Sequence, residues 1–299
     1  MTDLLTSKTC IVTGAGHGIG RATAIELGSL GANVVVNDLG SDVHGEGTSQ
    51  EPAEETVAAV EDAGGTAIAH FGDVTDLDYT ERLIADTVDE FGRVDGVANF
   101  AGILRDALAE NMTGDEWDAV INVHLRGHFS LLRNAAAHWA DSAPDGGFET
   151  SRSFVALTSR SALGNVGQVN YSTAKAGILG MIRTTSTELD RYNVRVNAVM
   201  PTAYTRMIED IPEEKQPFTR EDMPPERVAS MIGYLLSDAA DGITGSTLRV
   251  AGEQVGVVSH PELVRSGYRD GGWSAEDLAD GFTDDVAEGV DLDNSGGAF

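Results

Sequence analysis

The sequence predicts an α/β fold in which one doubly wound parallel sheet is covered by helices within a single domain. Two observations predict it. Short apolar runs of strand length alternate with longer segments of helical spacing over most of the 299 residues. No linker divides residues 1–258, so these are expected to form one domain, which is long enough to bury a core.

The expected strands are short and rich in apolar and β-branched residues. They cover, in chain order, 9–14, 33–38, 66–71, 96–100, 153–159, 194–199 and 246–252. The expected helices cover 20–30, 53–63, 77–92, 115–140, 171–191 and 225–237. Strands that alternate with helices join a parallel sheet through right-handed crossovers.

Two segments interrupt this alternation. A glycine-rich loop, 40–52, follows the second expected strand. Residues 259–299 are acidic and glycine-rich, so they are expected to form a C-terminal extension that is disordered over about its last ten residues.

The composition excludes several classes of partner. The formal net charge is −28, whereas a nucleic-acid partner needs a basic surface. No apolar stretch is long enough to span a membrane, and no secretory signal is recognised, so a cytoplasmic protein is expected. An acidic surface with only three lysines is typical of proteins from salt-loving organisms, although a high-GC genome would also deplete lysine. The single cysteine, Cys10, excludes an internal disulfide and is expected in the core.

The turn after the first expected strand reads TGAGHGIG. Gly14, Gly18 and Gly20, with Ile19 at the start of the first helix, would let the backbone approach a pyrophosphate, which a helix N-terminus favours electrostatically. The spacing is not G-x-G-x-x-G, and glycine also serves any sharp turn. Its position between a strand and a helix indicates a Rossmann-like fold that binds a dinucleotide.

Two acids at strand ends extend this interpretation. Asp38 ends the second expected strand, where a carboxylate binds both ribose hydroxyls of NAD and repels the 2′-phosphate of NADP. No arginine follows it immediately, so NAD is the expected cofactor; a solvated loop acid is the alternative. Asp73 and Val74 follow the third expected strand, where Asp73 would bind the adenine amine or form an Asx-turn.

Tyr171 and Lys175 are four residues apart on an expected helix, so their side chains face the same way. A phenol with a pKa of about 10 is a poor base at neutral pH, but a nearby ammonium would lower that pKa. The lysine could also hold a ribose, and a surface pair is the alternative. Three candidate hydroxyls precede the pair, on Thr158, Ser159 and Ser161.

These motifs, in this order, resemble the short-chain dehydrogenase/reductase family over residues 5–256. The motifs that carry the resemblance are the glycine-rich turn, N-x-A-G at Asn99, Ala101 and Gly102, then Asn122, a strand ending in hydroxyls, and Tyr-x-x-x-Lys. Two positions depart from the family pattern. Phe100 replaces the second asparagine of N-N-A-G, and Thr202 replaces the glycine after Pro201.

The resemblance implies roles for these residues. Tyr171 would be the general acid/base, and Lys175 would tune its pKa and bind ribose. A serine would orient the substrate carbonyl, and Asn122 would kink a long helix to hold a proton-relay water. Cofactor contacts would come from the glycine-rich turn, from the N-x-A-G motif, and from Pro201 and Thr205.

The choice among the three hydroxyls depends on where the expected strand 153–159 ends. The family's usual spacing before Tyr171 counts to Thr158, whereas the apolar run 153–159 looks like a strand that ends at Ser159. A deletion in the following loop is easier to tolerate than a shifted strand, which would turn every side chain to the other face. Ser159 is therefore the expected residue, ahead of Ser161 and Thr158.

Longer phrases resemble the (3R)-hydroxyacyl-CoA dehydrogenase unit of peroxisomal multifunctional enzymes. They are VVVNDLG, AGILRD, NVHLRGHF and GNVGQVNYSTAK. The resemblance implies reversible, metal-free hydride transfer between an alcohol or ketone substrate and NAD, with a CoA thioester favoured. The segment 202–218 would form a mobile lid. Arg105 or Arg206 would meet CoA phosphates, unless both are ordinary surface residues.

His124 and His128 have a spacing that zinc ligands use, but no third ligand is found, so no metal is expected. Packing in a dimer is the alternative role for this pair, since the family commonly assembles through this helix and the next. A homodimer or homotetramer is expected on that ground. Two further functions stay open, a steroid, sugar or small-ketone dehydrogenase of the same fold and a catalytically silent NAD-binding protein.

Overall fold

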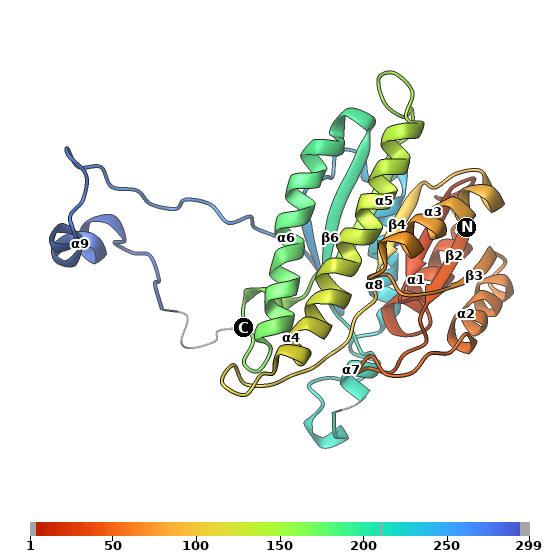
Figure 1. Cartoon of the computed structure of the whole chain (residues 1–299), viewed down its shortest axis with the longest axis horizontal. Coiled ribbons are helices and arrows are strands. Elements are labelled where there is room, and N and C mark those ends of the chain that lie inside the picture. Colours follow the sequence, from red (N-terminus) through yellow and green to blue (C-terminus); the bar gives the residue numbers. More distant parts are fainter. Residues whose placement is uncertain (1–3, 210, 294–299) are drawn as a thin grey trace. The chain divides into compact units, whose positions relative to one another are not determined.

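The computed structural model describes residues 4–209 and 211–293. The chain divides between Val258 and Ser259 into two compact units (Figure 1). The first contains the sheet and every motif singled out above.

Within the described residues the first unit is built on an eight-stranded sheet, in the order β3-β2-β1-β4-β5-β6-β7-β8. The strands are Thr9–Thr13 (β1), Asn33–Asp38 (β2), Thr66–Phe71 (β3), Gly96–Asn99 (β4), Arg152–Leu157 (β5), Val194–Thr202 (β6), Thr247–Ala251 (β7) and Gln254–Val258 (β8). β1 pairs in parallel with β2 on one side and with β4 on the other. The strand order reverses there, and ligands of open α/β sheets bind beside such a reversal.

Helices cover both faces of this sheet (Figure 1). One face carries α1 (Gly18–Ser29), α2 (Glu51–Asp62) and α8 (Pro225–Leu236). The other face carries α3 (Leu77–Phe91), α5 (Gly127–Ser142) and α6 (Val169–Leu189). The doubly wound architecture predicted from the sequence is confirmed.

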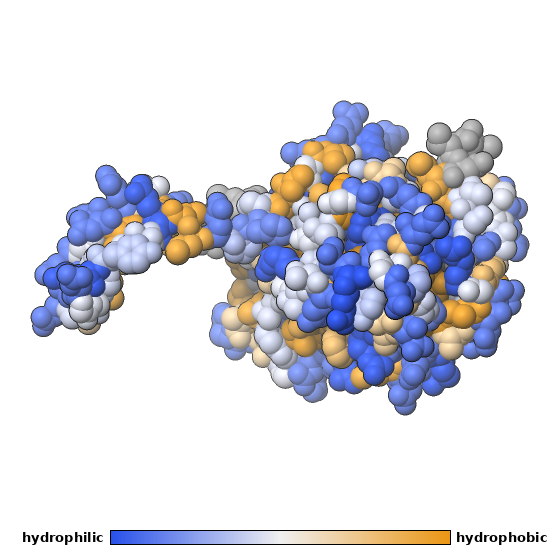
Figure 2. Space-filling view, turned by 90° about the horizontal axis from the view of Figure 1, so that it is seen from above, coloured by the Kyte–Doolittle hydropathy of each residue, from blue (hydrophilic) through white to orange (hydrophobic). Residues whose placement is uncertain are grey.

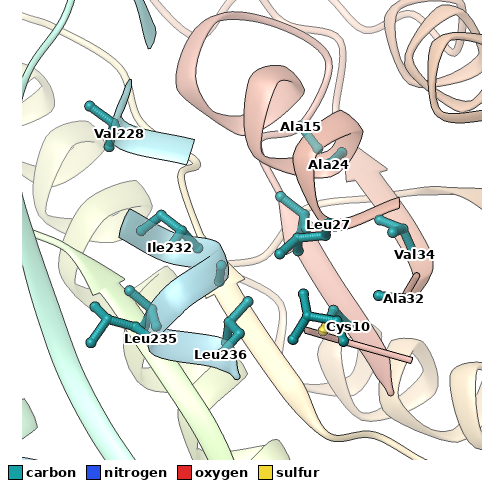
Figure 3. Packing of buried hydrophobic residues seen from close by; sticks show 14 of the residues in the cluster. Cys10, Ala15, Ala24, Leu27, Ala32, Val34, Val228, Ile232, Leu235 and Leu236 are labelled. Carbon is teal, nitrogen blue, oxygen red and sulfur yellow. The ribbon is translucent and has the colours of Figure 1, made fainter. Parts of the chain in front are cut away.

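Each face has its own apolar core. Figure 3 shows side chains of β1, β2, α1 and α8 filling one of them, with Cys10 among Leu27 and Leu236. Cys10 is fully buried, and burial raises the pKa of its thiol to about 12, so it is a core residue and not a reactive thiol. On the other face the Trp139 indole is fully buried and donates to the carbonyl of Val94 at 2.8 Å, which fixes α5.

The long helix expected over 115–140 is interrupted. It consists of α4 (Gly114–Ile121), a π-helical turn (Asn122–Arg126) and α5. The N–H of Gly127 donates to the carbonyl of Asn122, five residues back. Such π-turns are frequent at functional sites.

The strand β8 was not expected from the sequence. It returns antiparallel to β7 through the two-residue turn Gly252–Glu253, in which Gly252 has φ +57°. Val255 and Val257 are 63% and 78% exposed, so the strand lacks the buried apolar pattern by which the others are recognised. The sheet is therefore parallel except at this edge.

The remaining short elements lie in loops and in the second unit. The segment 202–218 contains α7 (Arg206–Glu209) and a 3₁₀ turn (Glu213–Lys215). The second unit contains α9 (Ala275–Gly281) and a π-turn (Phe282–Val286). Part of the expected disorder falls on 294–299, outside the described residues. Hydrophilic residues predominate on the face seen in Figure 2, and none of the helices described is long and apolar enough to cross a bilayer.

Candidate active site

Two cavities adjoin at the carboxyl ends of the strands. The first, of about 350 Å³, is lined by Ser159, Tyr171 and Lys175 and is called the tyrosine cavity here. The second, of about 550 Å³, is lined by Asp38 and Asp73 and is called the aspartate cavity. Four residues line both: Gly14, Phe100, Gly102 and Arg206. The motifs predicted for cofactor and for chemistry thus meet in one continuous region.

The glycine-rich turn forms the floor between the two cavities. Gly14 has φ +64°, and a Cβ there would lie 2.5 Å from the backbone nitrogen of Ala101. A Cβ on Gly20 would lie 2.1 Å from the carbonyl oxygen of Gly14. Only glycine fits these positions, and the start of α1 is left open as a cradle for a pyrophosphate. Gly18 and Ile19 line the tyrosine cavity, and so does Thr205, which lies against Gly18.

Asn99 supports this floor from below. Its Oδ1 accepts from the Thr13 hydroxyl at 2.8 Å and from the N–H of Ala101 at 3.1 Å. The side chain therefore ties β1 to β4 and shapes the turn that follows. Ala101 and Gly102 line the cavities, whereas Asn99 is fully buried behind them. Phe100, the departure from the family pattern, keeps its N–H bonded to Thr13 and lines both cavities.

Asp38 is held at the end of β2 by two backbone donors. Its Oδ2 accepts from Gly16 at 2.7 Å and its Oδ1 from Gly40 at 2.6 Å. The carboxylate lines the aspartate cavity, where a ribose would meet an acceptor.

Asp73 has two roles at once. Its Oδ1 accepts from the N–H of Thr75 at 2.8 Å, which is an Asx-turn, and it also lines the aspartate cavity next to Val74.

Tyr171 and Lys175 lie one turn apart on α6. The Lys175 ammonium is 5.5 Å from the centre of the Tyr171 ring and donates to the carbonyl of Leu157 at 2.7 Å. Ser159 lies just beyond the end of β5, and its hydroxyl acts to lower the pKa of Tyr171.

The other two candidate hydroxyls are engaged elsewhere. Thr158 donates to the carbonyl of Lys175 at 2.9 Å, and Ser161 donates to the Gln168 side chain at 3.0 Å. The geometry therefore favours Ser159 as the hydroxyl that acts with Tyr171.

Burial is the largest influence on the pKa values of Tyr171 and Lys175. It raises the pKa of Tyr171 to about 12, against the opposing effect of the Ser159 hydroxyl. It also lowers the pKa of Lys175 to about 7. The expectation that Lys175 brings the phenol below its ordinary pKa is thus corrected, because desolvation of the buried phenolate is the largest influence and raises the pKa.

Asn122 does not reach this pair. It is exposed and lines the aspartate cavity, while its carbonyl closes the π-turn. The side chain that lies against Tyr171 is His124, with ring centroids 4.9 Å apart and planes at 90°. The sequence drew attention to His124 and His128 as a zinc spacing or a pair packed in a dimer, and not as neighbours of Tyr171. Both nitrogens of His128 are engaged by backbone groups, so the pair is not arranged to hold a metal.

The segment after β6 completes the tyrosine cavity. Pro201 lines it, as the resemblance implies. Met207, Ile208 and Phe218 of the expected lid add apolar walls that no sequence motif indicated. The glycine cradle, the held carboxylate of Asp38 and the buried hydroxyl–lysine pair together fit a nicotinamide dinucleotide that extends across both cavities.

Comparison with known proteins agrees with this geometry. Residues 14–252 match the model of a short-chain dehydrogenase family described as enoyl-(acyl carrier protein) reductase. The chain is 40% identical over 283 residues to hydroxyacyl-CoA dehydrogenase ChsB1 of Mycobacterium tuberculosis, which covers 93% of this chain and 88% of that protein. It is 37% identical to peroxisomal multifunctional enzyme type 2 of Mus musculus over 78% of this chain, but over only 30% of that longer protein.

A solved structure shares the fold. The crystal structure of a short chain dehydrogenase from Mycobacterium avium matches with a TM-score of 0.79 and 36% identity, over 93% of each chain. The chain therefore belongs to the short-chain dehydrogenase/reductase family and is an oxidoreductase that binds a nicotinamide cofactor.

Proposed function

We propose that this enzyme oxidises a secondary alcohol to a ketone, reversibly, with NAD as cofactor and 3-hydroxyacyl-CoA thioesters as substrates. One observation carries the proposed chemistry. The Tyr171 phenol lies one turn from Lys175, the Ser159 hydroxyl is near enough to lower the pKa of Tyr171, and all three residues line one cavity.

The proposed reaction divides a hydride and a proton between two acceptors. The hydrogen on the carbinol carbon leaves with its electron pair, and the bound nicotinamide ring supplies the hydride acceptor. The hydroxyl proton passes to the Tyr171 oxygen as the carbon–oxygen double bond forms. Ser159 orients the reacting oxygen through its own hydroxyl.

The proton on the Tyr171 phenol is used differently in the two directions of the reaction. With a pKa of about 12 the phenol is protonated at neutral pH, so it is ready to donate to a carbonyl oxygen in the reduction. In the oxidation it must first lose that proton, which an ammonium on Lys175 favours. Lys175 would also hold the ribose next to the nicotinamide.

The choice of NAD rests on Asp38. Its carboxylate is fixed by the N–H groups of Gly16 and Gly40, so it cannot easily turn away from an incoming ribose. A fixed negative charge there binds ribose hydroxyls and repels a 2′-phosphate.

The substrate class rests on the relatives and on the cavity walls. Relatives named hydroxyacyl-CoA dehydrogenase and peroxisomal multifunctional enzyme support a CoA thioester. The tyrosine cavity combines the apolar Ile208 and Phe218 with the cationic Arg160 and Arg206, in a protein whose net charge is −28. An acyl chain and an anionic head group would each find a complementary wall.

A turnover assay tests the proposal. The purified chain, in low and in molar salt, is given NAD or NADP with (3R)- or (3S)-3-hydroxybutyryl-CoA or simple secondary alcohols, and reduced nicotinamide is followed by absorbance. NAD-dependent turnover of one thioester enantiomer supports the whole proposal. Turnover of unactivated alcohols alone would keep the chemistry and reject the thioester, and no turnover at all would reject both.

Matched variants test the residues. Tyr171→Phe is expected to remove turnover. Ser159→Ala is expected to lower kcat by about 100-fold or more, within the range for positioned acid–base groups. Ser161→Ala is the control, because its hydroxyl is bonded to Gln168. A larger loss in Ser161→Ala than in Ser159→Ala would reject the assignment.

We also propose that the enzyme is a homodimer or homotetramer that assembles through α5 and α6. Phe129 on α5 and Val169 on α6 are 49% and 40% exposed, which leaves apolar side chains available on both helices. Light scattering after gel filtration tests this. A monomer of 31.5 kDa in both low and molar salt would reject it.

A further inference from the structure

Two buried histidines lie one turn apart beside the tyrosine cavity, and their partners differ. His128 is fully buried, and its Nδ1 donates to the carbonyl of His124 at 2.6 Å. Its Nε2 accepts from the N–H of Leu157 at 3.2 Å. Both nitrogens have backbone partners, so His128 acts as a fixed link between α5 and β5.

His124 is only half satisfied. It is 1% exposed, and its Nε2 lies 3.1 Å from the nitrogen and 2.8 Å from the oxygen of Ile103. The contact with the oxygen is the shorter, so Nε2 carries the ring proton and donates to the Ile103 carbonyl, which leaves Nδ1 as an acceptor. Its Nδ1 is buried and has no partner among the described residues.

The unpartnered Nδ1 belongs to an imidazole ring that lies in the candidate active site. His124 lines the same cavity as Ser159 and Lys175 and stands edge-on to the ring of Tyr171. A buried polar atom without a partner costs free energy unless something binds it. With Nε2 committed to Ile103, Nδ1 is the atom left for a ligand.

The charge state of His124 limits what it can bind. Burial and then the neighbouring Lys175 hold its pKa well below the ordinary histidine value, so the ring stays neutral. A neutral imidazole nitrogen accepts a hydrogen bond without adding a second positive charge beside Lys175. It therefore suits a hydroxyl group and not a carboxylate or phosphate.

We propose that Nδ1 of His124 accepts a hydrogen bond from an O–H group in the tyrosine cavity and positions that group beside Tyr171 and Lys175. The O–H group belongs either to a ribose of the bound cofactor or to an ordered water. His124 is a positioning residue in both cases. The inference rests on the proposed function, since it assigns His124 to the same site.

The test compares His124→Phe with His128→Phe in the full chain. Phenylalanine keeps a flat ring against Tyr171 and removes both nitrogens. The measurements are the dissociation constant for NADH by fluorescence titration, kcat in H₂O and D₂O, and Tm. Losing one hydrogen bond to a ribose hydroxyl is expected to weaken NADH binding about tenfold in His124→Phe.

The two sources of the O–H group give different results. If it is a water, NADH binding changes less than about twofold, kcat falls about tenfold or more, and the solvent isotope effect on kcat changes. In both cases His124→Gln, which keeps a polar side chain, recovers part of the loss. His128→Phe is expected to lower Tm through its two orphaned backbone partners while NADH binding and the isotope effect stay as in wild type.

Two results would overturn the proposal. One is a folded His124→Phe whose NADH binding, kcat and isotope effect all match wild type. The other is a loss that His128→Phe reproduces in full, since it would then come from helix packing. If the wild type turns over no thioester, the proposed substrate fails on its own. NADH titration then still tests the ribose role of His124, and kcat with a simple secondary alcohol tests the water role.

Discussion

Replacing Lys175 with methionine is expected to abolish turnover. It is also expected to stabilise the folded protein at low pH and to destabilise it at high pH. The side chain is 2% exposed, and burial lowers its pKa from the ordinary 10.5 to about 7. Below pH 7 the lysine is charged in both the folded and the unfolded chain, so the folded state bears the whole penalty of burying that charge.

The size of the penalty follows from the shift. The difference between the ordinary pKa of 10.5 and the pKa of about 7 in the folded chain corresponds to about 5 kcal/mol, to order of magnitude. Between pH 7 and 10.5 the unfolded chain binds more protons than the folded chain, so wild-type stability increases with pH and the penalty is gone above 10.5. Methionine has no such penalty, but it leaves the Leu157 carbonyl without its 2.7 Å donor, which costs about 1–3 kcal/mol at every pH.

The two contributions have opposite signs. The variant is expected to be more stable than wild type by about 2–4 kcal/mol near pH 6 and less stable by about 1–3 kcal/mol above pH 10.5. Urea unfolding at several pH values in one salt concentration measures the difference, in which the titration of groups away from Lys175 cancels. His124 and His128, whose pKa values Lys175 lowers, add their own contribution. Lys215→Met is the control, because it makes the same replacement at an exposed lysine. A Lys175→Met protein that is less stable than wild type near pH 6, with the same gap at every pH, would refute the reasoning.

Three further predictions follow from particular contacts. Gly20→Ala is expected to lower the free energy of unfolding by about 2–4 kcal/mol, because its Cβ would lie 2.1 Å from the Gly14 carbonyl oxygen. The control is Gly180→Ala on α6, whose Cβ meets no described atom within 4 Å and which is expected to raise Tm. Equal Tm values for the two variants would contradict the turn geometry. Asp38→Asn is expected to shift the ratio of kcat/KM for NAD and NADP at least about tenfold toward NADP, and an unchanged ratio would remove Asp38 from cofactor selection. Raising KCl from about 0.1 to about 2 M is expected to raise Tm, because the net charge of −28 is then screened; a falling Tm would show that carboxylate repulsion does not limit stability.

The sequence predicts the parallel part of the fold well because most strands there are buried on both faces; the edge strand β3 is only partly buried. Asn33–Asp38 and Val194–Thr202 are buried at almost every position, without the alternation of a half-exposed strand, which is typical of a sheet covered by helices. The strand Gln254–Val258 was missed for the converse reason. Its valines are exposed, so it is held by backbone pairing to β7, which no hydropathy pattern records.

In the candidate site, too, some residues could be predicted from the sequence and others could not. The glycine turn, Asp38, Tyr171 and Lys175 could be found because their chemistry depends on spacing along one element. The choice between Asn122 and His124 could not, since they lie two residues apart on a helix and point in different directions. A kink at Asn122 was expected, but which of the two side chains meets Tyr171 depends on the geometry of the π-turn there.

The pKa of Tyr171 was also beyond reach of the sequence. Spacing shows that an ammonium is near the phenol, but the competing desolvation depends on how tightly the cavity walls close. Ser159 could be favoured over Thr158 from strand register alone. Only the positions of Lys175 and Gln168 show why the other two hydroxyls are occupied.

The wall shared by the two cavities limits how this enzyme can evolve. Gly14, Phe100, Gly102 and Arg206 line both sides, and Arg206 also donates to the Ser41 carbonyl at 3.0 Å in the glycine-rich loop. A mutation of any of these four residues changes the affinity for the cofactor and the affinity for the substrate together. Selection for a new cofactor at these positions therefore also changes the range of substrates. Independent variation is open only away from this wall, at positions such as His44 on one side and Phe218 on the other. Lineages that diverge in substrate alone are therefore expected to accumulate their differences in the lid and to inherit the wall unchanged.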